Sequence, residues 1–149
     1  MRKSKWRIEI VNGMDSKTEM EMDNRNDEFI FEKLDVYHLA VGYYTSIREI
    51  KFSSTDHDRI IARQLLRAGL SISLNIAEGA GKKTPKDKRN YFLIARGSLY
   101  ECVAIMNILK IENKVSPSNH QTSYSLAIRI SKMLTALVKR MDQESLSPE

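Results

Sequence analysis

Residues 64–83 read QLLRAGLSISLNIAEGAGKK, and this stretch decides the fold because, as a helix, it has almost no face suited to water. At about 100° per residue, the helix around it presents two apolar faces that lie roughly opposite each other. The first face holds Ile61, Leu65, Ala68, Ile72 and Ile76, and the second holds Leu66, Leu70, Leu74 and Ala77. Two apolar faces require two partners, so the stretch predicts a packed assembly. The sequence leaves open which face meets a subunit's own core and which meets a neighbour.

A polar seam separates the two apolar faces and consists of Gln64, Arg67, Ser71, Asn75 and Glu78. Charged groups on helices built for burial need partners. We therefore expect Arg67 to pair with Glu78 or with Glu101, and Asn75 to satisfy polar groups at a subunit boundary. A catalytic interpretation would make the two glutamates an acid and base pair or metal ligands. A di-iron bundle needs repeated Glu-x-x-His elements, and the chain has none, which favours a structural or interface role.

The rest of the chain predicts three further helices. Apolar residues recur at steps of three and four in 31–50, and 121–142 repeats the pattern. Thr55 with Asp58 can form a capping box that starts the second helix, which runs to about residue 79. Thr84 and Pro85 suit the start of a third helix, 85–112. Short loops between four such helices predict an all-α, antiparallel up-down four-helix bundle over residues 29–143, with a flexible or partly extended segment before it (1–28) and a disordered tail after it (144–149).

The composition and motifs of the chain limit the classes of function that it can have. The 149 residues carry a net charge of +5, and residues 1–28 hold six basic and seven acidic groups, so the basic excess lies in the bundle. No signal peptide or uncharged apolar run of about 18 residues occurs, so we expect a cytoplasmic protein without a membrane span. Phosphate-loop, dinucleotide, Cys-x-x-Cys, His-Glu-x-x-His and Gly-x-Ser-x-Gly motifs are all absent from the sequence. His38, His57 and His120 lack metal-ligand spacing and suit surface or cap positions, and Cys102 suits a buried, inert thiol. We therefore expect no enzyme activity, cofactor or metal.

The best candidate contact surface is residues 82–89, KKTPKDKR, in which five of eight residues are basic. Exposed cations beside the free amides of a helix N-terminus favour phosphate binding. The alternative is a solvated polar face that keeps an apolar bundle soluble. We predict contact with RNA or DNA through a set of six residues: Lys82, Lys83, Lys86, Lys88, Arg89 and Arg96. No aromatic residues are interleaved with this run, so it does not predict sequence-specific reading of single strands.

Three blocks in order carry a family resemblance: FxxLxxYxxA in 31–40, QxxRAxxSIxxNIAEG in 64–79 and YFxIAxGSxxE in 91–101. Over residues 31–137 the chain resembles the four helix bundle proteins encoded in intervening sequences of bacterial 23S rRNA genes. The resemblance implies a closed homo-oligomeric ring, commonly a pentamer, whose basic surface engages nucleic acid. A related branch, the accessory variability determinant of diversity-generating retroelements, assists a reverse transcriptase. The alternative function is therefore a protein-interaction scaffold or accessory subunit for a nucleic-acid enzyme. Residues 1–28 depart from the family pattern, and no family role is assigned to them.

Overall fold

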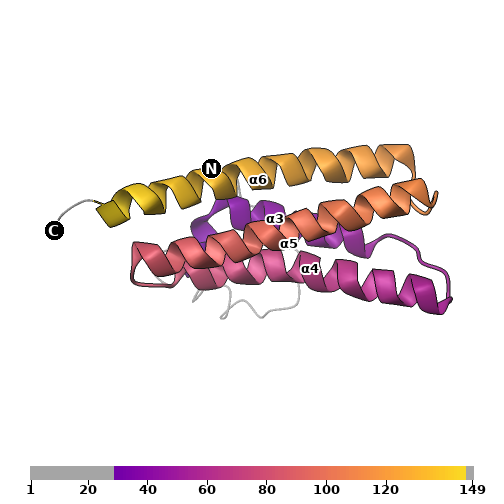
Figure 1. Ribbon diagram of the computed structural model, residues 1–149, viewed down its shortest axis with the longest axis horizontal. Helices are drawn as coiled ribbons and strands as arrows, with labels where there is room; N and C mark the ends of the chain where they lie inside the picture. The colour runs from indigo at the N-terminus through magenta and orange to yellow at the C-terminus, as the bar shows by residue number, and fades with distance from the viewer. Residues whose placement is uncertain (1–28, 147–149) are drawn as a thin grey trace, which may run out of the picture.

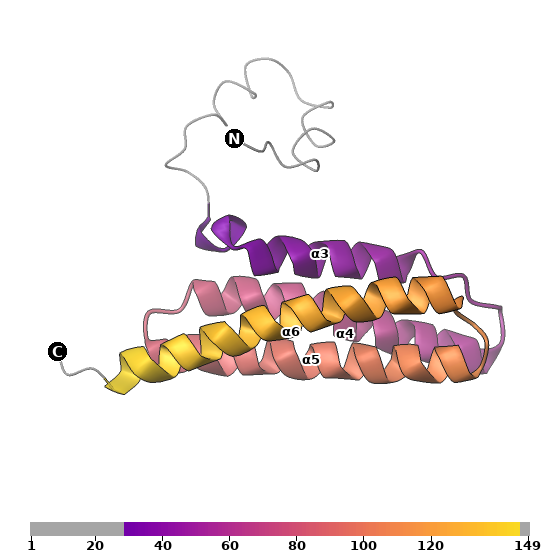
Figure 2. The same ribbon diagram turned by 90° about the horizontal axis from the view of Figure 1, so that it is seen from above.

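The computed structural model describes residues 29–146, which form four α-helices and one short 3-10 helix, with no strand among them (Figure 1). The all-α prediction is confirmed. The prediction for residues 1–28 lies outside the described residues. The elements are η1 (Ile30–Lys33), α3 (Asp35–Arg48), α4 (Asp56–Ala80), α5 (Pro85–Ile111) and α6 (Pro117–Leu146). Each helix packs on the next along the chain, and α3 also packs on α6, which closes the bundle around one core (Figure 2).

The helix starts at α4 and α5 follow the predicted capping residues. The Thr55 hydroxyl accepts a hydrogen bond from the Asp58 amide at 3.2 Å, and the Thr84 hydroxyl accepts one from the Asp87 amide at 3.1 Å. Pro85 occupies the first turn of α5, where its missing N–H costs nothing. Both helices therefore begin where local chemistry alone sets the boundary.

Two helix boundaries differ from the prediction. The first predicted helix is split, because Leu34 is extended (φ −91°, ψ 118°) and separates η1 from α3. The last helix begins four residues earlier than predicted and runs on to Leu146. Residues 116–119 look like a turn in the sequence, but the Ser116 hydroxyl accepts a hydrogen bond from the Asn119 amide at 3.2 Å and Pro117 starts the helix. Ser116 and Pro117 therefore start a helix here, although serine and proline are also typical of turns.

The structure decides which face of α4 forms the core. Leu65 has 0% of its surface exposed and lies on the first predicted face, whereas Leu70 and Leu74 on the second face are 42% and 57% exposed. The first face packs against buried residues of the other helices, including Tyr43, Leu99, Cys102, Ile130 and Leu134. The second apolar face is therefore the one left without a partner in a single chain.

Close contact between α4 and α5 depends on Gly79. A Cβ atom at this position would lie 2.8 Å from Cβ of Tyr91 and 3.1 Å from the ring of Phe92. The first distance is shorter than real Cβ atoms adopt and the second is unusually tight, so glycine lets the two helices approach this closely just before the turn that joins them.

By length and composition alone, α5 is the one helix among residues 29–146 that could cross a membrane. In the bundle α5 packs against both α4 and α6. The side chains that it buries include Phe92, Leu99, Met106 and Leu109. The core helix of a soluble protein meets the same criterion, so this is weak evidence for a span. Its high hydropathy has a simple cause: its outer face is apolar as well as its core face.

Candidate nucleic-acid interface

The turn between α4 and α5 brings together four of the six predicted contact residues: Lys82, Lys83, Lys86 and Lys88. It lies at the end of the bundle where α6 also finishes (Figure 1). Lys83 and Lys86 are exposed and Lys88 is half-buried, and none of these three ammonium groups has a hydrogen bond or ion pair with any residue in 29–146. They stand beside the N-terminus of α5, whose dipole adds to the positive potential. We call Lys83, Lys86 and Lys88 the free lysines.

Lys82 differs from its neighbours because its charge is already engaged. Its Nζ donates a hydrogen bond to Glu78 Oε1 at 3.1 Å and lies 4.6 Å from the centroid of the Tyr91 ring. Hydrogen bonds from Tyr91 and then from Lys82 lower the pKa of Glu78, and the bond to Glu78 is the main reason that the pKa of Lys82 is raised. Lys82 is thus positioned to fix the turn against α5, and its charge is less available to a ligand than those of the free lysines.

The two predicted arginines point towards α6. Arg89 Nε donates to Asp142 Oδ1 at 2.5 Å, and an Arg96 guanidinium nitrogen donates to the Thr135 hydroxyl at 3.4 Å. Both contacts tie α5 to α6. The geometry therefore narrows the predicted surface, because these two side chains already have protein partners, whereas the free lysines have none in the part of the chain that the structure describes.

The tertiary structure adds two basic residues that sequence reasoning missed. Lys139 and Arg140 are exposed on α6 immediately before Asp142, the partner of Arg89, so they lie at the same end of the bundle as the free lysines. Arg140 forms an ion pair with Glu144 at 2.7 Å, whereas Lys139 has no ion-pair partner within residues 29–146. In the sequence both are ordinary outer residues of an amphipathic helix, and no local signal links them to residues more than 50 positions earlier.

The predicted polar seam runs along the contact between α4 and α5. Asn75 Nδ2 donates to the Ser71 carbonyl at 2.8 Å and to the Ser71 hydroxyl at 3.0 Å. The Ser98 hydroxyl donates to the Ile94 carbonyl at 3.1 Å, which leaves Ser71 to donate to Ser98 across 2.9 Å. Each proton thus has an acceptor, and the chain of hydrogen bonds fixes the register of the two helices. These groups have structural partners within one subunit.

The predicted pairing of Arg67 with a glutamate is wrong. Gln64 donates a hydrogen bond to Glu101, and Glu78 forms an ion pair with Lys82. Arg67 is exposed and has no ion pair with either glutamate in the part of the chain that the structure describes. The cause is its direction on the helix, since it lies nearly opposite the core face of α4 instead of facing α5. Arg67 adds a cation to the outer surface.

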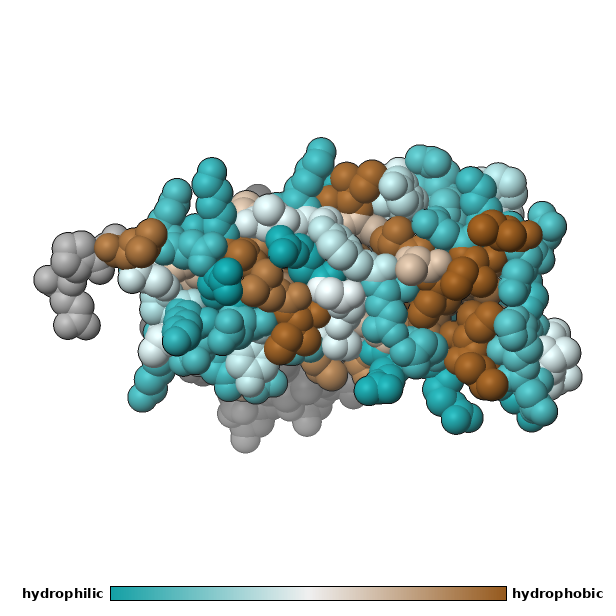
Figure 3. All heavy atoms as spheres, in the orientation of Figure 1, coloured by the Kyte–Doolittle hydropathy of each residue, from teal (hydrophilic) through white to brown (hydrophobic). Residues whose placement is uncertain are grey.

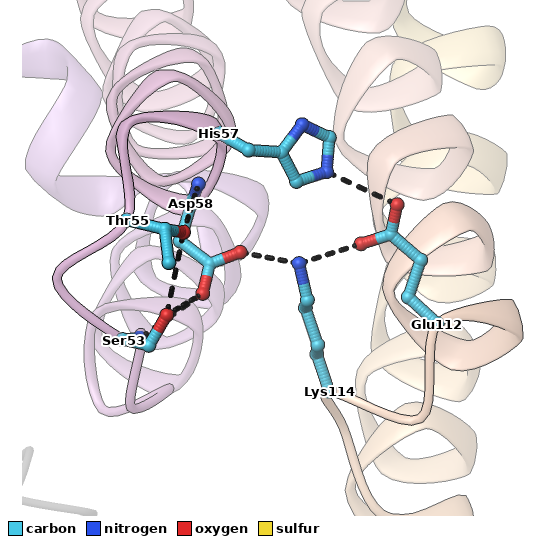
Figure 4. A network of polar contacts seen from close by, with 6 residues as sticks. All are labelled: Ser53, Thr55, His57, Asp58, Glu112 and Lys114. Carbon is cyan, nitrogen blue, oxygen red and sulfur yellow. Dashed lines mark hydrogen bonds and ion pairs between the residues drawn. The ribbon is translucent and has the colours of Figure 1, made fainter.

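A second polar cluster lies at the other end of the bundle (Figure 4). We call it the end clasp; it comprises Ser53, His57, Asp58, Glu112 and Lys114. Lys114 bridges the buried Asp58 carboxylate and Glu112, the latter at 2.9 Å, and His57 Nε2 lies 3.1 Å from Glu112. The bond from Lys114, followed by that from Ser53, lowers the pKa of Asp58 to about 2. The clasp joins the loop before α4 to the turn after α5, and its carboxylates are occupied by a cation of the protein itself.

The remaining chemical candidates are weak. No group of three His, Cys, Asp or Glu residues among 29–146 could hold a metal ion. His120 is not a surface residue as predicted; it is buried and its Nε2 lies 2.8 Å from Asn107 Oδ1, because the early start of α6 carries it under α5. Burial raises the pKa of Cys102 to about 12, as expected for an unreactive thiol. A hollow of about 410 Å³ is lined by residues of α6 alone and is a surface depression.

The described residues thus define an all-α four-helix bundle with a lysine-rich turn at one end. The family model of 23S rRNA-intervening sequence proteins matches residues 32–136, and the chain belongs to this family. The resemblance drawn from the three sequence blocks is confirmed. Among solved structures, the chain is similar to a protein of unknown function from the S23 ribosomal protein family of Bacteroides thetaiotaomicron, with a TM-score of 0.64 and 22% identity over 70% of this chain and 98% of the other. This likeness concerns the fold. No curated protein matches the chain.

Proposed function

We propose that this protein is a non-enzymatic, cytoplasmic, antiparallel up-down bundle that assembles into a closed homo-oligomer and binds structured nucleic acid, RNA in particular, through its lysine-rich turn. The observation that carries the proposal is the set of free lysines: three ammonium groups at the start of a long helix that have no hydrogen-bond or ion-pair partner among residues 29–146. Phosphate groups are the natural ligands of such a site, because they accept hydrogen bonds from ammonium and backbone amide groups and are stabilised by the helix dipole.

The charge of the bundle supports a polyanionic ligand. Residues 29–146 contain 18 lysines and arginines against 11 aspartates and glutamates, a net charge of +7. Several of the acids are neutralised inside the bundle, such as Asp58 and Glu112 in the end clasp. Such pairing removes cations as well as acids from the balance, so the bundle keeps its positive excess, which attracts a nucleic acid backbone without reading its sequence.

The exposed apolar surface supports self-association. It runs along α4, α5 and α6 and includes Leu70, Leu74, Ile94, Tyr100, Ile108, Tyr124 and Ile128. Figure 3 shows brown, hydrophobic groups on the face of the bundle that it presents, interrupted by polar side chains. An apolar surface of this kind on a small soluble bundle is typical of an interface. Because it lies on the sides of the bundle and the free lysines lie at an end, a ring of parallel copies, five by family resemblance, would gather the lysines on one rim and bind RNA multivalently.

The second candidate function uses two other exposed apolar residues to bind a different protein. Ile60 and Ile111 are 68% and 80% exposed near the end clasp, at the end opposite the free lysines. A nucleic-acid enzyme held there would sit apart from RNA bound at the rim, which is the arrangement that an accessory subunit needs. A stable partner that co-purifies after nuclease treatment, and that Ile111→Glu releases, would favour this function.

The test of RNA binding compares two triple variants of equal charge. In the first, Lys83, Lys86 and Lys88 are changed to glutamine. In the second, three exposed lysines elsewhere, Lys51, Lys110 and Lys132, are changed in the same way. The proteins are nuclease-treated, washed at high salt and titrated with a structured ribosomal RNA fragment at several salt concentrations.

We expect the first variant to lose affinity and to show a shallower salt dependence. Each lost phosphate contact lowers the slope of log K against log salt by about 0.7–0.9, so the loss of three lowers it by roughly 2 to 3 for each subunit engaged. The control should bind nearly as the parent does. Equal losses in the two variants would mean that net charge, and not the turn, governs binding; absence of salt-sensitive binding by the parent would refute the proposal altogether.

A further inference from the structure

Three arginines follow one another along the outer side of α4. Arg59, Arg63 and Arg67 are spaced four residues apart, so each step rises about 6 Å along the helix axis and the three lie within about 80° of arc. All three are exposed, and they lie on the side of α4 opposite its core residues, such as Leu65 and Ile72. We call them the arginine row.

The arginine row has little acidic compensation. Asp56 is the one acid three or four residues from any of its members, and it lies 3.6 Å from Arg59 in a pair whose side chains are 95% and 64% exposed. Arg63 and Arg67 form no hydrogen bond or ion pair with any residue in 29–146. Like charges four residues apart destabilise a helix slightly, and a single exposed ion pair offsets little of this. The charge pattern is therefore unfavourable for the helix alone and favourable against an anionic ligand.

The arginine row and the free lysines lie toward opposite ends of the bundle. α4 begins beside the end clasp and finishes at the lysine-rich turn (Figure 1). Eighteen positions separate Arg63, the middle of the row, from Gly81, the C-cap of α4. This corresponds to a rise of about 27 Å, which one strand of a duplex covers with roughly eight phosphates at about 3.4 Å each. Each surface would therefore hold its own stretch of backbone.

We propose that the arginine row is a second nucleic-acid-binding surface, so that the bundle holds two segments of one structured RNA, one toward each end. The ligand is the phosphate backbone, and this identity rests on the proposed function. A planar guanidinium donates two parallel hydrogen bonds to one phosphate, which an ammonium does not. The row is about 12 Å long, the advance of three to four phosphates along one strand, so its members can meet neighbouring phosphates.

The test uses the full chain with a triple variant, Arg59→Gln, Arg63→Gln and Arg67→Gln, because glutamine forms helices about as well as arginine. It is compared with the free-lysine variant and with the control variant at Lys51, Lys110 and Lys132. Lys51 and Lys110 flank the end clasp, so the control also removes charge from the end that carries the row. Circular dichroism and light scattering check that helix content and mass are unchanged.

Titration with the structured ribosomal RNA fragment should show a loss of affinity for the arginine variant. The slope of log K against log salt should fall by roughly 2 to 3 for each subunit engaged, while the control stays close to the parent. Arginine-to-lysine changes at the same three positions should restore most of the slope but not all of the affinity, because the charge returns without the paired hydrogen bonds. Photo-cross-linking of thiouridine-substituted RNA should label the first half of α4 as well as the lysine-rich turn.

RNA length tests whether both surfaces hold one molecule. An oligonucleotide of about six nucleotides spans roughly 20 Å and reaches one surface at a time, so each triple variant should remove about half of its binding. The long fragment engages both surfaces, and each triple variant should weaken its binding by more than about tenfold. Equal effects on short and long RNA would overturn the joint binding.

The remaining outcomes separate this inference from the proposed function. If the arginine variant binds RNA as the control does, or if α4 is not cross-linked, the second surface is wrong, and the row is then free to meet an acidic protein. The proposed function still stands in that case, provided that the free-lysine variant loses affinity. If the free-lysine variant binds as the parent does and the arginine variant does not, the lysine-rich turn is wrong and the arginine row stands. A parent without salt-sensitive binding overturns both.

Discussion

Replacing Gly79 with alanine should destabilise the protein, although alanine is the better helix former. Gly→Ala in a helix interior stabilises by about 1 kcal/mol when space is free. At Gly79 the new Cβ would stand 2.8 Å from Cβ of Tyr91, an atom that moves only with the backbone of α5, and 3.1 Å from the Phe92 ring. Separating α4 from α5 to relieve this contact is overpacking, which costs about 1–3 kcal/mol. The expected net change is a loss of up to about 2 kcal/mol.

Gly42→Ala is the matched control, because Gly42 lies in α3 and no atom lies within 4 Å of the Cβ position. It should stabilise by about 0.5–1 kcal/mol. For a domain of this size, 1 kcal/mol corresponds to about 3–5 °C, so the midpoints of the two variants should differ by up to roughly 15 °C. The assay is thermal and urea unfolding followed by far-ultraviolet circular dichroism at one protein concentration, since the proposed self-association would also contribute to stability. Equal stabilisation by both substitutions would refute the close approach of α4 and α5 at Gly79.

Three further predictions concern the end clasp, the faces of α4 and the thiol. The pKa of Asp58 is lowered from 3.8 to about 2, so the ionised carboxylate stabilises the fold above its ordinary pKa and this effect is lost as pH falls towards 2. Asp58→Asn should therefore lower the free energy of unfolding at pH 7 and make it depend less on pH in the acid range. Urea midpoints measured across the pH range will test this. Leu65→Glu should unfold the chain, whereas Leu74→Glu should keep its helix content and reduce the mass seen by light scattering; an unchanged mass would place the subunit contact elsewhere. Cys102, with its pKa raised to about 12, should react with a thiol reagent at pH 8 only after urea is added, and rapid labelling of the folded protein would contradict its burial.

The position of the lysine-rich turn follows from a few local rules. Gly81 is the C-cap of α4, and Thr84 and Pro85 start α5, so the turn is short and Lys82 and Lys83 lie directly before the first residues of α5. These rules act over three or four residues, which is why the sequence alone predicts this part of the site. They also place the lysines beside the amides of a helix N-terminus, since the cap and the cations share one loop.

The sequence does not predict in the same way which basic side chains form ion pairs with acidic ones. Arg89 meets Asp142, 53 residues later, and Lys114 meets Asp58, 56 residues earlier. Whether such pairs form depends on the rotation and register of packed helices, which no local pattern encodes. The same applies to Arg67, whose expected partner is taken by another residue.

By itself, the sequence determined the all-α class, the family, the starts of α4 and α5 and the cluster of lysines between them, because capping, helical periodicity and charge are local properties. The tertiary structure decided which face of α4 is core and that His120 is buried. It also decided that, among residues 29–146, Arg67 and the free lysines have no ion-pair partner. Two opposite apolar faces on one helix are equivalent until neighbouring helices cover one of them. Burial and pairing are therefore properties of the packed bundle, and they single out Lys83, Lys86 and Lys88 from a basic run that the sequence presents as uniform.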